Sequence, residues 1–298
     1  MASGEWRVLM DRPSWFQRLR RLLRSYKAAF MDGDILQRPA PHADIRIPYG
    51  PDPLHFGDLR LPSDDGPHPV VVVIHGGFWR ARFSLEHIGH ACAALTSGGV
   101  ATWSVEYRRI GNPGGRWPGT FLDVAAGVDH LREIAPIHNL DLSRVVVIGH
   151  SAGGHLALWV AGRTRIPAGD PLYTPSPLPV QAAISLAGVA DLRRGWEMAL
   201  SNGVVQDLMG GTPEEMPERY ATASPIELLP LGVRQVLIHG TEDENVPFEI
   251  SQAYHKAALS KGDDCELITL HGAGHFEVID PRTQEWKQVV AAVNAALA

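Results

Sequence analysis

Cysteine is scarce in this chain of 298 residues, which contains only Cys92 and Cys265. Two cysteines are too few for a disulfide scaffold, and both fall in segments that we interpret as a helix and a strand. The N-terminus also lacks the basic and apolar pattern of a secretory signal. We therefore expect a soluble chain in a reducing compartment, which favours a cytoplasmic protein.

Long hydrophobic runs are absent as well. None approaches the roughly 18 to 20 apolar residues that a membrane-spanning helix needs, so we expect no transmembrane segment. The net charge is -6 and no basic tract crosses the body of the chain, which argues against nucleic-acid partners. Neither a P-loop nor a dinucleotide fingerprint occurs, and no histidine pair joins acids or cysteines at ligand spacing. We expect no cofactor and no metal ion.

The first 44 residues differ from the rest in charge and periodicity. Basic residues outnumber acidic ones over the first 40 positions, and apolar residues from Trp15 to Phe30 recur at steps of three or four. This pattern predicts one basic amphipathic helix. Its apolar stripe is expected to dock on the same protein, as a lid or a dimer contact, and a membrane surface or an acidic partner is the alternative.

Residues 45–298 alternate apolar runs with helical stretches. The expected strands are 70–74, 100–105, 145–148, 182–186, 236–239 and 266–270. The expected helices are 85–96, 121–134, 154–163, 249–260 and 283–296. Several strands are apolar on both faces, which predicts an α/β fold with a doubly wound, mostly parallel sheet. Residues 188–232 have few strand signals and are expected to form a helical cap insertion over a site.

The strongest chemical signal is Gly149-His150-Ser151-Ala152-Gly153, which stands between an expected strand and an expected helix. A serine on such a sharp turn is thrust outward, and only small neighbours let the backbone bend so tightly. A chance Gly/Ser turn is the alternative, but the strand before it and the helix after it favour a nucleophile elbow at Ser151.

A serine nucleophile needs a base and a group that orients the base. Asp243 follows the expected strand 236–239, and His275 follows the strand 266–270 in a glycine-bounded loop. The order Ser151, Asp243, His275 is that of an α/β-hydrolase triad. Glu242 and Glu244 are neighbouring acids, and we favour Asp243 because it stands in an H-G-x-x-D-x-x-V-P context.

The segment His75-Gly76-Gly77-Phe78-Trp79 directly follows the apolar run 70–74. Backbone N–H groups there would stabilise a tetrahedral oxyanion, together with the N–H of Ala152 after the serine. We expect Gly77 and Phe78 to supply donors, Gly76 to keep the turn open, and Trp79 to form a substrate wall. A plain glycine turn is the alternative.

Other polar residues receive ordinary structural interpretations. His87 and His90 lie three apart on an expected helix, where a solvated face is favoured over a metal site. His150 and His155 flank the elbow and are expected to pack or form a supporting hydrogen bond. Glu106 either holds a loop near the site or is a surface carboxylate.

These segments carry a family resemblance. HGGFW at 75–79, GHSAGG at 149–154, HGTEDENVP at 239–247 and GAGH at 272–275 resemble the α/β-hydrolase superfamily. Within it they are most similar to the esterase and kynurenine formamidase (arylformamidase) branch, whose oxyanion loop reads H-G-G-x-W. The resemblance extends from about residue 45 to the C-terminus, and it implies the α/β-hydrolase fold and a serine hydrolase.

Three functions follow as hypotheses. The first is a serine carboxylesterase that hydrolyses small to medium acyl esters through an acyl-serine intermediate. The second is an arylformamidase that hydrolyses N-formylkynurenine. The third, of another class, is a non-catalytic binding module on a hydrolase fold. The expected partner is a small-molecule ester or formamide, and a homodimer is compatible with the sequence.

Overall fold

The computed structural model describes residues 34–298. The chain divides into two compact units, Met1–Arg38 and Pro39–Ala298. In the first unit the described residues form the short helix α2 (Asp34–Gln37), and the second unit contains all the other elements. The amphipathic helix predicted between Trp15 and Phe30 lies outside the described residues.

An eight-stranded sheet organises the second unit, in the order β1-β2-β4-β3-β5-β6-β7-β8. β1 pairs with β2 and β2 with β4 in antiparallel fashion, and every other pairing is parallel. The strands are β1 (Ile45–Pro48), β2 (Phe56–Arg60), β3 (His68–Ile74), β4 (Ala101–Val105), β5 (Leu140–His150), β6 (Ala182–Leu186), β7 (Arg234–Gly240) and β8 (Cys265–Leu270). The predicted mostly parallel sheet is confirmed.

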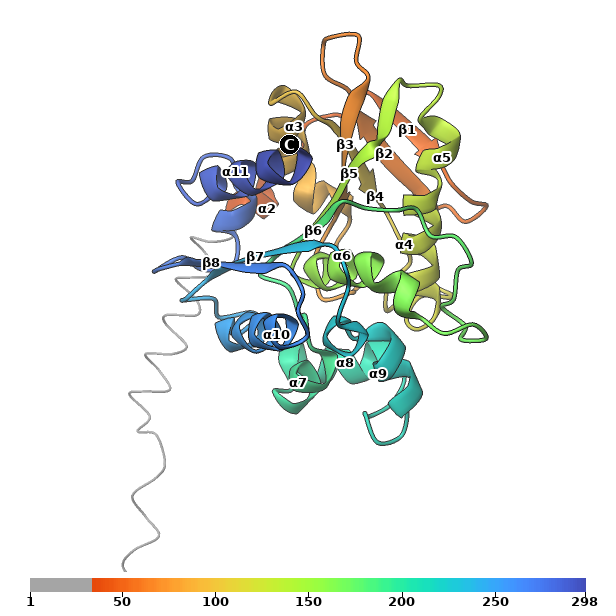
Figure 1. The fold of residues 1–298 in the computed structure, drawn as a ribbon, viewed down its shortest axis with the longest axis vertical. Coiled ribbons are helices and arrows are strands. Elements are labelled where there is room, and N and C mark those ends of the chain that lie inside the picture. Colours follow the sequence, from red (N-terminus) through yellow and green to blue (C-terminus); the bar gives the residue numbers. More distant parts are fainter. Residues whose placement is uncertain (1–33) are drawn as a thin grey trace, which may run out of the picture. The chain divides into compact units, whose positions relative to one another are not determined.

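Helices cover both faces of this sheet. Figure 1 shows α3 and α11 together on one side, and α4, α6 and α10 on the other. The α-helices of this unit are α3 (Gly89–Ser97), α4 (Gly119–Asp129), α5 (Leu131–Ile134), α6 (Ala152–Gly162), α7 (Leu192–Glu197), α8 (Leu200–Met209), α9 (Pro217–Ala223), α10 (Phe248–Ser260) and α11 (Trp286–Leu297). The 3-10 helices are η1 (Leu85–Ile88), η2 (Arg163–Arg165), η3 (Pro225–Leu228) and η4 (Glu277–Ile279). This is the doubly wound arrangement that the alternation of strands and helices predicted.

The central strands are buried on both faces, and for this reason they appear in the sequence as continuous apolar runs. The side chains of Val70–Ile74 in β3 are at most 1% exposed, because β4 and β5 flank this strand and helices cover both of its faces. Branched apolar residues pack well at such positions. β1 and β2 were not among the strands expected from the sequence. β1 has only four residues, three of them exposed, so no apolar run marks it.

The connection between β6 and β7 contains helices α7, α8 and α9, in the stretch where a cap insertion is predicted. It contacts the loops after two other strands. The guanidinium of Arg80, after β3, donates to the carbonyl of Ser201 at 2.8 Å, and the N–H of Trp117, after β4, donates to the carbonyl of Leu208 at 2.9 Å. The segment therefore lies against loops at the carboxyl edge of the sheet.

The described part of the chain, residues 34–298, has no helix that combines the length and the apolarity needed to cross a membrane. Cys92 in α3 and Cys265 at the start of β8 are both buried free thiols.

Candidate active site

The four sequence motifs lie at the carboxyl ends of β3, β5, β7 and β8. These strands are parallel, so their carboxyl ends meet at one edge of the sheet. Ligand sites of open α/β sheets lie at this edge. The topology therefore brings together segments that are far apart in the sequence.

Ser151 occupies a sharp turn between β5 and α6. Its φ and ψ are 57° and −119°, a backbone conformation that residues other than glycine rarely adopt. The turn is held from both sides, since the Ser151 N–H donates to the Leu186 carbonyl at 2.8 Å and the Ser151 carbonyl accepts from the His155 N–H at 3.1 Å. The sharp strand-to-helix turn predicted at Ser151 is present.

His275 and Asp243 meet at this edge. The imidazole Nδ1 of His275 lies 2.6 Å from Oδ2 of Asp243, and both side chains are almost completely buried. Because a carboxylate can only accept, Nδ1 carries the hydrogen and Nε2 is left with a lone pair. Glu242 and Glu244 are exposed, so Asp243 is the one of the three neighbouring acids that contacts His275.

Two further contacts hold the Asp243 carboxylate. Its Oδ1 accepts from the N–H groups of Asn245 and Val246, each at 2.8 Å. Its Oδ2 also lies 3.1 Å from Nε2 of His239. Burial by itself would raise the pKa of Asp243, but the contacts with His275 and His239 outweigh burial and hold this pKa well below its usual range.

His239 was not among the site residues expected from the sequence. Its contact with Asp243 has a sequence signal, however, because the two residues are four apart in the H-G-x-x-D segment that begins at the end of β7. Such spacing allows contact across one tight turn.

The loop after β3 lies against the serine turn. A Cβ at Gly76 would be 2.7 Å from the His150 carbonyl oxygen and 3.1 Å from the Ser151 Cβ, so only glycine fits there. Gly77 and Phe78 have positive φ angles of 108° and 52°, which is a strained backbone for a phenylalanine. The loop predicted to supply oxyanion donors is therefore next to Ser151.

Trp79 does not line an open surface. Its side chain is completely buried in the core, and its ring meets the ring of His155 edge-on at 5.2 Å between centroids. The prediction that Trp79 forms a substrate wall is wrong for this conformation. A large apolar ring next to the sheet gains more by burial than by facing water, whereas Phe78 remains partly exposed.

A buried polar network supports the loop from below. Oε1 of Glu106 lies 2.9 Å from Nε2 of His75 and 2.8 Å from Nη1 of Arg109, and the Tyr107 hydroxyl donates to the His75 carbonyl at 2.9 Å. Burial would raise the pKa of Glu106, but His75 and Arg109 together lower it below its usual value. Glu106 is therefore a carboxylate that holds a loop near the site and not a surface carboxylate.

His150 and His87 form a second, partly buried contact next to His275. Nε2 of His150 lies 2.9 Å from the carbonyl oxygen of His275, and Nδ1 of His150 lies 2.8 Å from Nε2 of His87. The expectation that His87 sits on a solvated helix face is wrong, since η1 turns it inward. Burial lowers the pKa of His87 to about 3 and that of His150 well below its usual value.

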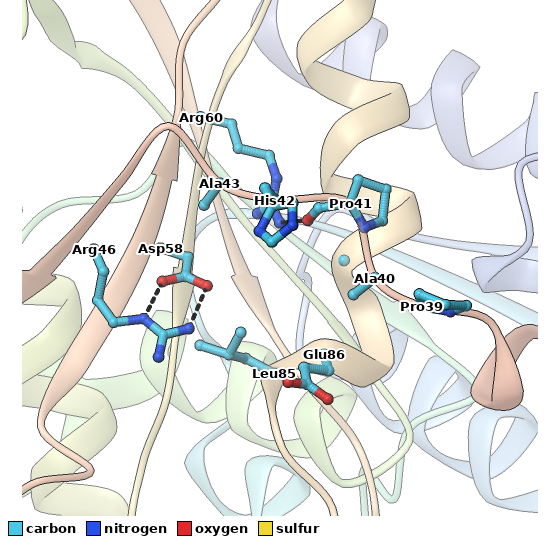
Figure 2. A pocket seen from close by; sticks show the side chains of 11 residues that line it. Pro39, Ala40, Pro41, His42, Ala43, Arg46, Asp58, Arg60, Leu85 and Glu86 are labelled. Carbon is cyan, nitrogen blue, oxygen red and sulfur yellow. Dashed lines mark hydrogen bonds and ion pairs between the residues drawn. The ribbon is translucent and has the colours of Figure 1, made fainter.

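The cavity in Figure 2 is not lined by Ser151, Asp243 or His275. It has a volume of about 500 Å³ and is lined by residues 39–43, by β1 and β2, by the start of η1 and by the first residue of α3. Arg46 and Asp58 form a forked ion pair on its wall, at 2.7 and 3.0 Å. Among residues 34–298, no group of three or more His, Cys, Asp and Glu residues is arranged to hold a metal ion.

Comparisons with known proteins agree with this architecture. The chain is 31% identical over 255 residues to the esterase LipC of Mycobacterium tuberculosis, which covers 79% of this chain and 60% of LipC. It is 23% identical over 292 residues to the kynurenine formamidase of Danio rerio, which covers 96% of this chain and 93% of that protein. The chain spans only about three fifths of the length of the first curated relatives that it matches.

A solved structure has the same fold. A truncated carbohydrate esterase from gut microbiota superposes with a TM-score of 0.72 at 23% identity, covering 87% of this chain and 97% of that one. The BD-FAE family model matches residues 58–258, which include the loop 75–79, the Ser151 turn and Asp243. The chain therefore belongs to the BD-FAE family, within the α/β-hydrolase superfamily.

Proposed function

We propose that this protein is a serine carboxylesterase that hydrolyses small to medium acyl esters. The observation that carries the proposal is the 2.6 Å contact between Nδ1 of His275 and Asp243, at the same sheet edge as the strained turn of Ser151. A base oriented by a buried carboxylate, together with an outward-thrust serine, is what acyl transfer needs. The esterase LipC, as the relative with 31% identity, supports the same reaction class.

The proposed reaction has two halves. Nε2 of His275 takes the hydroxyl proton of Ser151 as the serine oxygen attacks the acyl carbon, and Asp243 stabilises the imidazolium that forms. The imidazolium then gives its proton to the leaving alcohol, which leaves an acyl-serine. The same imidazole then takes a proton from water as the water attacks the acyl carbon. The bond from the acyl carbon to the Ser151 oxygen breaks, the imidazolium returns its proton to that oxygen, and the carboxylic acid is released.

The tetrahedral intermediates need donors for their oxyanion. The N–H of Ala152 is the first of α6 and has no acceptor within the helix, so it is available to a substrate oxygen. Gly77 and Phe78 would supply the donors on the facing loop. Donors fixed in this way contribute most of the stabilisation in comparable sites, about 3 to 4 kcal/mol for one donor.

The segment 188–232 is proposed to act as a cap that limits the size of the acyl group. The contact of Arg80 with Ser201 supports this role, because Arg80 follows the oxyanion loop directly and Ser201 belongs to α8. A substrate that reaches the loop would lie close to α8.

A side-by-side assay tests the main proposal. The value of kcat/KM is measured for p-nitrophenyl butyrate and for N-formylkynurenine, with the Ser151→Ala variant as the blank. Ester turnover that this variant loses supports the carboxylesterase. If correctly folded wild-type protein fails to turn over any short-chain activated ester, the proposal is refuted.

An arylformamidase is the second candidate. It is favoured by the H-G-G-F-W loop at 75–79 and by similarity to the Danio rerio kynurenine formamidase over nearly the full length of both chains. A large preference for the formyl amide in the same assay would select this function. A binding module without catalysis would instead be indicated if a serine-reactive phosphonate did not label Ser151.

A further inference from the structure

His239 shares a carboxylate oxygen with the proposed base. Oδ2 of Asp243 lies 2.6 Å from Nδ1 of His275 and 3.1 Å from Nε2 of His239. His239 is the penultimate residue of β7, and His275 lies in the loop after β8. One oxygen atom is therefore the meeting point of two histidine side chains, of which a triad uses only one.

The surroundings of His239 determine which of its nitrogens is the donor. Nε2 also lies 2.9 Å from the carbonyl oxygen of Val246, so this nitrogen faces two groups that can only accept. Nε2 must carry a hydrogen, which it donates toward Asp243 and Val246. Nδ1 lies 2.7 Å from the hydroxyl of Ser251 in α10, which fixes the ring from its other side. His239 has no exposed surface, so water does not compete for its hydrogen bonds.

We propose that His239 is a positioning residue that sets the basicity of His275 through Asp243. This inference rests on the proposed serine-hydrolase function for its kinetic meaning. Each hydrogen bond that Oδ2 accepts withdraws negative charge from it. With His239 present, Asp243 attracts the proton on His275 less strongly, so His275 stays unprotonated down to a lower pH and can act as base there.

The other titratable groups that face His275 do not provide this control. The ring of His150 is tilted against that of His275 with 4.5 Å between ring centroids, and His87 contacts His150 in turn. Burial keeps both of these imidazoles neutral near pH 7, since it lowers the pKa of each far below that pH. The charge on Asp243 is thus the one that acts on the His275 ring, and His239 is the side chain that moderates it.

The experiment compares two substitutions of His239 in the full chain. His239→Asn removes the donor, because its side chain is too short to reach Asp243, whereas His239→Gln keeps an N–H at nearly the position of Nε2. The pKa of His275 is measured by NMR of protein labelled at the histidine rings. This measurement does not depend on activity, so it remains decisive even if the esterase proposal fails.

We expect His239→Asn to raise the pKa of His275 by about 0.5 to 1, which is about a three- to tenfold increase in proton affinity. The acid limb of the kcat/KM profile should move upward by the same amount. His239→Gln should recover most of the difference. The matched control is His68→Gln, since His68 is another buried histidine, at the opposite edge of the sheet.

A purely structural role predicts a different pattern. In that case His239→Asn and His68→Gln would both lower stability and leave the pKa of His275 as it is in the wild type. That result overturns the proposal, as does an equal shift in the Asn and Gln variants. If His239→Asn does not fold, His239→Phe replaces it, because a phenyl ring fills most of the buried volume of the imidazole without its N–H, and an unchanged His275 pKa there also overturns the proposal.

Discussion

Replacing Gly153 by alanine tests how closely the serine helix must approach the sheet. A Cβ at position 153 would lie 2.0 Å from the carbonyl oxygen of Ile74 and 2.6 Å from that of His75. Real Cβ contacts essentially never fall below 3.0 Å. The first turn of α6 would therefore have to move away from the end of β3 by at least about 1 Å, because both obstructing atoms are backbone and cannot rotate aside.

This movement separates Ser151 from the loop of Gly76 and Gly77. A misplacement of about 1 Å costs on the order of 100-fold in rate, and overpacking of a dense interior costs about 1 to 3 kcal/mol. We expect Gly153→Ala to lower kcat for p-nitrophenyl butyrate by about 100-fold and to lower the free energy of unfolding in urea by an amount in that range.

Gly98→Ala is the matched control. Gly98 ends α3 with a negative φ, and its added Cβ would meet one carbonyl oxygen at 3.1 Å and nothing else closer than 3.7 Å. This variant should keep wild-type kcat and a nearly unchanged stability. If Gly153→Ala has the kcat and stability of Gly98→Ala, the reasoning from close backbone approach is refuted.

Three other substitutions give separate outcomes. Asp243→Asn should lower kcat by about 10⁴-fold without unfolding the protein, because an amide cannot stabilise the imidazolium of His275, and wild-type activity would remove Asp243 from the mechanism. Glu106→Gln should lower the free energy of unfolding in urea by about 3 to 5 kcal/mol, since it leaves the buried guanidinium of Arg109 without its counter-charge, and a neutral effect would contradict this. Burial lowers the pKa of His155 to about 4, so the unfolded chain binds this proton more readily and stability falls as the pH drops from about 6.5 toward 4. Between pH 7 and pH 5, His155→Gln should therefore lose about 2 kcal/mol less unfolding free energy than the wild type, measured by urea titration at both pH values. If the two proteins lose the same amount, the pKa of His155 is not lowered by burial.

The main elements of the fold could be predicted because their signals are local. The six strands expected from apolar runs all occur in the structure as β3 to β8. The strand pair β1 and β2 was missed because β1 is short and largely exposed, so its apolar pattern does not differ from that of a loop. The antiparallel edge of the sheet forms because β2 pairs with β4. No local sequence pattern predicts which strand a segment pairs with.

The candidate site divides in the same way. Ser151, Asp243 and His275 could be nominated from short motifs, because each motif follows a strand and the carboxyl ends of parallel strands share an edge. Their catalytic roles remain a prediction until the variants are measured. His87 and Trp79 were misjudged because neighbours in the sequence do not show which way a side chain turns.

By itself, then, the sequence determined the order of strands and helices, the parallel character of the sheet and the loops that gather at its carboxyl edge. It could do so because apolar periodicity and glycine turns act over a few residues. Only the tertiary structure decided that Trp79 is core, that His87 reaches His150, and that His239 and His275 share Oδ2 of Asp243. Those contacts join residues from separate elements, and their geometry is set by how the elements pack against one another.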